Sequence, residues 1–200
     1  MRRAAFTLVE ALVVIGIIII LVGISIPAIG KIQSESQSLG CIANLKQLFS
    51  GVEVYRQANN TLLPNAEPLP AVGVDGPIGG LPAVLKAYVS RESTSWLCPA
   101  DSDPESFETG TSYLYLPGLY ILTPGIQLQL PPNAFDLPPK QRRTLEAQLV
   151  TALYEGDTPL PLLLDSQDRH PIGTRIPRNG VYIDGSARVL PKSLVTPAEP

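Results

Sequence analysis

Few residues of this chain are of the types that carry out chemistry, and they lie far apart in the sequence. The 200 residues include one histidine, His170, and two cysteines, Cys41 and Cys98. Nucleophilic, metal-dependent or phosphate-binding catalysis would favour motifs such as Gly-x-Ser-x-Gly, His-Glu-x-x-His or a Walker loop, and the sequence contains none of them. Asp101, Asp103 and Glu105 are interpreted as a solvated loop. The sequence therefore predicts no enzyme, no catalytic residue and no cofactor.

The two cysteines leave two interpretations open. In a domain exposed to an oxidising compartment, Cys41 and Cys98 could form a disulfide. It would close a long loop and stabilise the fold by on the order of 4 kcal/mol in the chain-entropy model. Alternatively, both are small buried apolar side chains. Two cysteines and one histidine do not make a zinc site, so no metal site is predicted.

Apolar residues are concentrated near the N-terminus, where residues 11–30 carry no charge. As a helix this run is about 30 Å long, which matches the hydrocarbon core of a bilayer. It is too long for the apolar part of a cleaved secretory signal, about 7 to 15 residues. Arg2 and Arg3 precede it, which favours a cytoplasmic N-terminus. The sequence predicts a single-pass anchor and one exposed domain.

Glu10 lies at the start of this apolar run. A carboxylate that moves toward the bilayer centre costs about 2.5 kcal/mol or more, so we expect Glu10 to have a partner. The plainer interpretation is an uncleaved anchor with Glu10 at the headgroup boundary. Residues 5–10, AFTLVE, resemble the cleavage and assembly motif of type IV prepilins. The resemblance extends over about the first 55 residues.

This resemblance implies a role for each matching residue. The prepilin leader peptidase would cut between Ala5 and Phe6, although most family members have Gly where this chain has Ala5. The same enzyme would N-methylate Phe6, and Glu10 would pair with the Phe6 amine of a neighbouring copy in a filament. Pro27 falls where pilins carry a helix-distorting proline, whose missing N–H loosens the helix.

The rest of the chain predicts an α+β, pilin-like domain with a long N-terminal helix packed on a small antiparallel sheet. Its expected parts are a leader (1–5), a transmembrane helix (6–30), an amphipathic continuation (31–60) and an extracytoplasmic domain (61–200). The core face of the continuation is expected to comprise Ile32, Leu39, Ile42, Leu45, Leu48, Phe49, Val52 and Tyr55.

Smaller elements follow from local patterns. A short helix is expected in 81–90 and a longer one over 138–155. Strands are expected at 111–116, 118–122 and 160–164, with the tyrosines of the first two on a half-exposed sheet face. Residues 180–190 are predicted to form a hairpin that turns at Asp184-Gly185.

The domain also resembles a bacterial family of secretion-type prepilin-like proteins. The matching residues are Cys41, the NLKQL segment 44–48, the WLCP segment 96–99, His170, Asn179-Gly180 and Asp184-Gly185. The family usually has His after the last pair, where this chain has Ser186. Some secretion pseudopilins bind calcium, so Asp165, Asp168 and Asp184 are candidates, but they lack a dense ligand ladder.

The function expected from these resemblances is structural. The chain would be a subunit of a type II secretion pseudopilus or type IV pilus-like filament. It would be processed by prepilin peptidase and assembled with copies of itself or related pilins by inner-membrane machinery. The expected location is the bacterial inner membrane, in contact with the lipid bilayer, with the C-terminal domain periplasmic or extracellular. The alternative is a membrane-anchored minor subunit or binding protein outside the filament body.

Nucleic acid is not an expected partner. The chain carries a net charge of −3, and the part after residue 30 is mildly acidic. Binding to phosphates without sequence preference requires a clustered positive surface, and the one tight basic cluster in the sequence is Lys140, Arg142 and Arg143.

Overall fold

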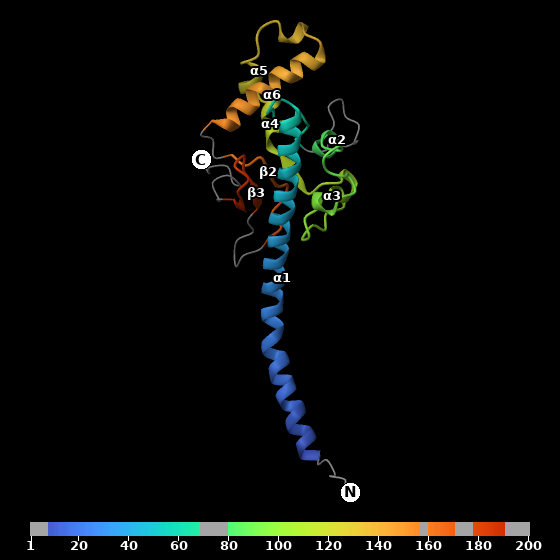
Figure 1. Cartoon of the computed structure of the whole chain (residues 1–200). Coiled ribbons are helices and arrows are strands. Elements are labelled where there is room, and N and C mark those ends of the chain that lie inside the picture. Colours follow the sequence, from blue (N-terminus) through green and yellow to red (C-terminus); the bar gives the residue numbers. More distant parts are fainter. Residues whose placement is uncertain (1–7, 69–79, 157–159, 171–177, 191–200) are drawn as a thin grey trace, which may run out of the picture.

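A single long helix carries a small α+β domain at one end (Figure 1). The computed structural model describes residues 8–68, 80–156, 160–170 and 178–190, and for 24–29 and 31 it describes the backbone alone. Helix α1 (Leu8–Ala58) is 51 residues long, which corresponds to about 75 Å. Its N-terminal part projects away from the domain, and its C-terminal part runs through the domain.

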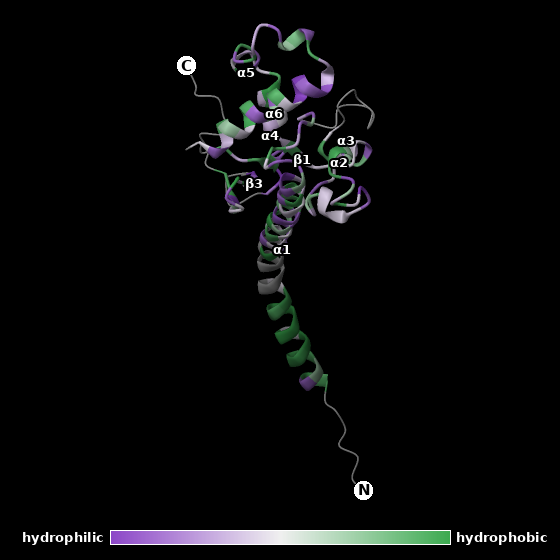
Figure 2. Ribbon diagram, turned by 45° about the horizontal axis from the view of Figure 1, so that its top comes forward, coloured by the Kyte–Doolittle hydropathy of each residue, from purple (hydrophilic) through white to green (hydrophobic). Residues whose placement is uncertain are grey.

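The projecting part of α1 is apolar and exposed. Figure 2 shows it as a continuous hydrophobic segment, and the relative exposure of its large side chains ranges from 49% at Val14 to 79% at Leu8. Within the described residues, no helix is both long and apolar enough to cross a membrane. The predicted leader, Ala5, Phe6 and the Pro27 side chain lie outside the description, so the membrane span 6–30 stays a prediction.

The C-terminal part of α1 provides the centre of the core. Cys41, Leu45, Leu48 and Val52 follow one another at steps of four, three and four, and all are fully buried. Steps of three and four place side chains on one face of a helix. The predicted face was correct for Leu45, Leu48 and Val52.

Two residues assigned to that face are exposed: Ile32 by 63% and Leu39 by 67%. Among the α1 side chains that the structure describes, the first buried one is Ser38, so Ile32 precedes the part of the helix that packs on the domain, and Leu39 lies off the buried face. Gly51 lets the helix approach the domain closely. A Cβ at this position would lie 2.3 Å from Val89 Cγ2.

Helix α1 ends close to residue 60, the boundary predicted for its amphipathic continuation. Its last residue is Ala58, and Asn60 and Thr61, two and three residues later, have positive φ angles of 53° and 62°. The Thr61 N–H donates to the carbonyl of Arg56 at 2.8 Å, which satisfies a carbonyl at the helix terminus.

A four-stranded antiparallel sheet packs against α1. Its strands are β1 (Tyr113–Tyr115), β2 (Leu163–Asp165), β3 (Asn179–Val181) and β4 (Ala187–Val189), in the order β1-β2-β3-β4. Tyr113 pairs with Asp165. The hairpin prediction is confirmed: β3 and β4 pair, and Gly185 between them has a φ of 77°, a conformation that glycine adopts without strain.

Short helices complete the domain. They are α2 (Leu81–Val84), the 3₁₀ turn η1 (Thr94–Trp96), α3 (Pro104–Thr109), α4 (Leu116–Ile121), α5 (Pro124–Gln127), the 3₁₀ turn η2 (Ala134–Asp136) and α6 (Pro139–Glu155). Helix α6 confirms the predicted second helix. The helix expected in 81–90 is limited to the single turn of α2.

Two predictions about the tyrosine-rich segment are wrong. Residues 118–122 are not a strand but lie largely in α4, because Pro117 favours the first turn of a helix. Gly118 also packs there so tightly that a Cβ would lie 2.3 Å from the carbonyl oxygen of Ala66. Tyr113 and Tyr115 are buried, not half-exposed. The Tyr115 hydroxyl can be buried because it donates to the carbonyl of Pro64 at 2.9 Å.

Candidate functional site

Four chemically active side chains from separate segments meet inside the domain. Cys41 lies on α1, Cys98 follows η1, Asp165 ends β2, and His170 follows β2. One ligand-type atom from each lies within 4.8 Å of the others, and all four residues are buried. We call Cys41, Cys98, Asp165 and His170 the Cys-His-Asp cluster.

The fold positions each member through backbone structure. Cys41 starts the buried face of α1, so its thiol points into the core. The Cys98 N–H donates to Ser112 Oγ at 2.9 Å, which fixes this residue beside β1. The Asp165 carboxylate accepts from the backbone N–H of Asn179 at 2.7 Å, so the acid is held at the edge where β2 meets β3.

The atoms of the cluster are in direct contact. Cys41 Sγ donates to Asp165 Oδ1 at 2.9 Å. His170 Nε2 lies 3.3 Å from Cys98 Sγ and 3.3 Å from Asp165 Oδ2. His170 Nδ1 is buried and has no hydrogen-bond partner among the described residues. In a Cys–His–Asp catalytic relay the acid contacts the ring nitrogen opposite the nucleophile. Here both contacts are made to the same nitrogen, so the cluster does not have relay geometry.

These contacts shift the pKa values of side chains in the cluster. A hydrogen bond with Cys98, burial and the Asp165 charge all raise the pKa of the Cys41 thiol. The same hydrogen bond lowers the pKa of Cys98 to about 6, against the opposing effect of burial. Burial lowers the pKa of His170, but hydrogen bonds to Asp165 and Cys98 outweigh it and raise the value to about 9. The contacts thus favour the thiol form of Cys41, the thiolate form of Cys98 and the imidazolium form of His170.

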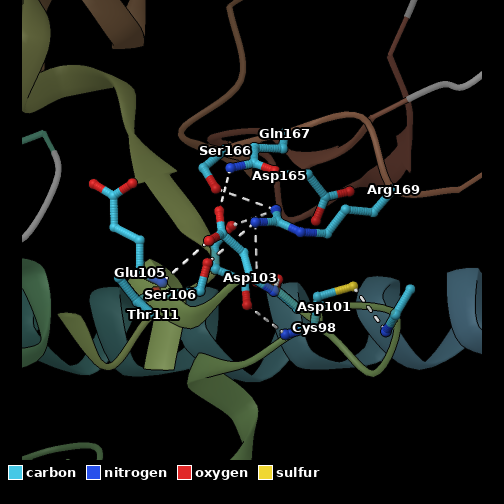
Figure 3. Close-up of polar contacts among 12 residues, drawn as sticks. Cys98, Asp101, Asp103, Glu105, Ser106, Thr111, Asp165, Ser166, Gln167 and Arg169 are labelled. Carbon is cyan, nitrogen blue, oxygen red and sulfur yellow. Dashed lines mark hydrogen bonds and ion pairs between the residues drawn. The ribbon is translucent and has the colours of Figure 1, made fainter. Parts of the chain in front are cut away.

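A buried ion pair lies beside the cluster (Figure 3). Arg169 Nη2 is 3.0 Å from Asp101 Oδ2, with side-chain exposures of 5% and 0%. Arg169 also donates to Ser106 Oγ, Ser166 Oγ and the carbonyl of Ser112. The prediction of a solvated loop was therefore wrong for Asp101, because a cation 68 positions later in the sequence lies against it. Asp103 caps α3 and Glu105 is exposed, as expected of a surface loop.

The site residues predicted from the sequence are those of the prepilin motif and the two cysteines. Glu10 lies in the first turn of α1 and is exposed. Ala5 and Phe6 lie outside the described residues, and Pro27 is described only as part of the α1 backbone. Cys41 and Cys98 are brought together, but their thiols are free in the structure, so the disulfide stays a prediction.

The three acids considered for calcium are not brought together. Asp165 belongs to the Cys-His-Asp cluster, Asp168 pairs with Arg178 at 2.6 Å, and Asp184 caps its own turn by accepting from the Ser186 N–H. Among the described residues, the Cys-His-Asp cluster is the one group of three or more such side chains close enough to share a metal ion.

The sequence did not predict this cluster, although it named every member separately. Cys41 fits the i, i+4, i+7, i+11 spacing of Leu45, Leu48 and Val52, a signal that its thiol points inward. His170 lies five positions after Asp165, which ends a buried strand. The pairing of β1 with β2, which brings Asp165 to Tyr113 and the neighbourhood of Cys98, had no local signal.

Comparison of the chain with family models, with curated proteins and with solved structures finds no match. Its function is therefore argued from its own residues.

Proposed function

We propose that the chain is a structural subunit of a pilus-like filament, either a type II secretion pseudopilus or a type IV pilus-like fibre. Prepilin peptidase would remove residues 1–5, and the mature chain would be held in the bacterial inner membrane by its N-terminal helix until inner-membrane machinery assembles it. The C-terminal domain would face the periplasm or the cell exterior.

The exposed apolar part of α1 carries this proposal. The large aliphatic side chains from Leu8 to Val22 are all exposed, so the domain does not cover them. Large exposed apolar patches mark surfaces that another molecule covers. A helix that is apolar all around suits insertion among lipids or among other helices. Packing of these helices between neighbouring copies would form the filament core.

The position of Glu10 fits the same proposal. It stands in the first turn of α1, at the end most distant from the domain. In the prepilin pattern, a Glu at this place pairs with the N-terminal amine of Phe6 in a neighbouring copy. The α+β domain around the other end of the helix also fits a pilin-like arrangement. We expect the domain to form the outer layer of the filament and the apolar helices its centre.

Site-specific photo-cross-linking tests the proposal. A photoreactive residue would replace Ile18, which is exposed on the apolar part of α1, or Gln37, an exposed matched control on the same helix beside the domain. In cells with an active assembly system, the Ile18 position should yield a ladder of covalent multimers of this chain. The Gln37 position should yield far fewer covalent multimers.

Other results would contradict the proposal. Adducts of the Ile18 variant with lipid alone, in assembling cells, would identify a membrane-anchored protein outside the filament body, which is the alternative function. Adducts with neither lipid nor another copy would contradict both functions.

A further inference from the structure

We propose that Cys41, Cys98, Asp165 and His170 form a structural zinc site. The inference rests on the geometry of the domain and is independent of the filament proposal. It names a ligand that neither the sequence motifs nor the resemblance to prepilins assigns.

The first argument is the set of donor types. Two cysteines, one histidine and one carboxylate provide two sulfur, one nitrogen and one oxygen ligand, which is a complete set for four-coordinate zinc. Thiolate and imidazole favour zinc over calcium or magnesium, which prefer oxygen ligands. All four side chains are buried, as in a closed structural site with no position left open for substrate.

The second argument is the spacing of the donor atoms. Around tetrahedral zinc, with bonds of about 2.0 Å to nitrogen or oxygen and about 2.3 Å to sulfur, neighbouring ligand atoms are separated by about 3.3 to 3.8 Å. His170 Nε2 is 3.3 Å from both Cys98 Sγ and Asp165 Oδ2. One ligand atom from each of the four residues lies within 4.8 Å of the others. The four donor atoms are thus close enough together to share one zinc ion.

The third argument is the support around the ligands. Asp165 Oδ2 accepts from the Asn179 N–H at 2.7 Å, and Cys98 Sγ accepts from the Ala100 N–H at 3.4 Å. The Asn179 side chain is in turn within 3.2 Å of Ser38 Oγ on α1. Such outer contacts orient the ligands of metal sites. His170 Nδ1, which would carry the ring proton, has no partner among the described residues.

The charges of the cluster also favour a cation. Two cysteines and a carboxylate are buried together with a single imidazole, and Arg169, which precedes His170 in the sequence, is paired with Asp101. Buried ionisable groups are costly unless they are paired or coordinate a metal. On zinc binding, Cys41 and His170 would each release one proton to solvent, so that the metal is held by two thiolates, the Asp165 carboxylate and Nε2 of a neutral imidazole. The site would then carry one net negative charge.

The metal would join three parts of the domain. Cys41 belongs to α1, Cys98 to the segment between η1 and α3, and Asp165 with His170 to the end of β2. Because each of the four described strands is three residues long, a bound zinc would help to hold the sheet and the loop on the helix. Metal binding to a site that forms only in the folded state adds directly to the free energy of unfolding.

The metal content of the full chain tests the proposal. The protein would be purified in detergent with its thiols reduced by a phosphine, loaded with zinc and dialysed into metal-free buffer. We expect one zinc per chain by mass spectrometric metal analysis. X-ray absorption at the zinc edge should show two sulfur atoms at about 2.3 Å and two nitrogen or oxygen atoms at about 2.0 Å.

Variants identify the ligands. Cys98→Ser and Asp165→Asn should each weaken zinc binding by about 100-fold or more, measured by competition with a chromophoric chelator. Asp168→Asn is the matched control, because that carboxylate pairs with Arg178 at the surface, and it should bind zinc like the wild type. The fluorescence of buried Trp96 reports whether each variant is folded.

Three results would overturn the proposal without any variant. One is a folded wild-type chain with both thiols reduced that retains no zinc after loading. Another is a chain isolated from its own cells with Cys41 and Cys98 joined as a disulfide, established by peptide mass spectrometry, and without bound metal. A zinc edge spectrum without sulfur ligands would also overturn it.

Discussion

Glu10→Gln should leave cleavage at the Ala5–Phe6 bond intact and abolish incorporation of the chain into filaments. The amide keeps the size of the side chain but removes the charge that would pair with the Phe6 amine of the neighbouring copy. A carboxylate among apolar helices costs about 2.5 kcal/mol or more without a partner. A pairing of that strength corresponds to about 70-fold in association per subunit. Loss of this contribution to association at every added copy should prevent growth of the filament.

The measurement compares, by immunoblot, the amount of this chain in the sheared filament fraction with the amount in the membrane fraction. Glu35→Gln is the matched control, since Glu35 is another exposed glutamate on α1 but lies outside the motif. We expect it to assemble at the wild-type level. Normal filaments from Glu10→Gln would refute the pairing role, and loss of cleavage in this variant would place Glu10 in peptidase recognition instead.

Arg169→Met should destabilise the domain by about 3 to 5 kcal/mol. The substitution keeps much of the apolar stem but removes the cation that lies 3.0 Å from the fully buried Asp101 carboxylate. Removing one partner of a buried pair leaves an uncompensated charge, which is costly because water cannot reach it. Urea unfolding of the full chain in detergent, followed by Trp96 fluorescence, gives the free energy of unfolding.

Arg178→Met is the control for this prediction. Arg178 pairs with Asp168 at 2.6 Å, but the two side chains are 26% and 43% exposed, so solvent screens the pair. Exposed pairs contribute about 0 to 1 kcal/mol. Equal effects of the two substitutions would show that the Asp101–Arg169 pair is not a buried structural contact.

The Asp101–Arg169 pair makes the stability of the domain depend on pH. Burial alone would raise the pKa of Asp101, but hydrogen bonds from Ser112, Asp103 and Ser106 and the charge of Arg169 outweigh it and hold the pKa below its usual value. A depressed folded pKa adds stability above the unfolded pKa, about 4, and this stability is lost as pH falls through the folded value. Arg169→Met should therefore reduce the acid sensitivity of unfolding together with the stability.

The sequence predicted those parts of the fold that depend on local patterns. The helical face with Leu45, Leu48 and Val52, the end of α1 near residue 60, helix α6 and the Asp184-Gly185 turn all arise from spacing or turn chemistry within a few residues. The α+β class and the small antiparallel sheet followed from these elements. The physical causes of these features lie within a few residues, so a single sequence was sufficient to predict them.

The errors concern long-range contacts. Tyr113 and Tyr115 were expected at a half-exposed face because tyrosine carries a polar hydroxyl, but the Tyr115 hydroxyl finds the Pro64 carbonyl 51 positions away. Asp101 was expected in water because its cation, Arg169, is distant in sequence. The Cys-His-Asp cluster was missed for the same reason, since the pairing of β1 with β2 brings its members together.

Mass spectrometry of the N-terminus tests the central claim most directly. The chain would be isolated from cells that contain an active prepilin peptidase, and its N-terminal peptide would be sequenced. The proposal predicts a mature chain that begins with N-methylated Phe6 and lacks residues 1–5. An intact leader that begins at Met1 in those cells, or cleavage at any other bond, would contradict the account.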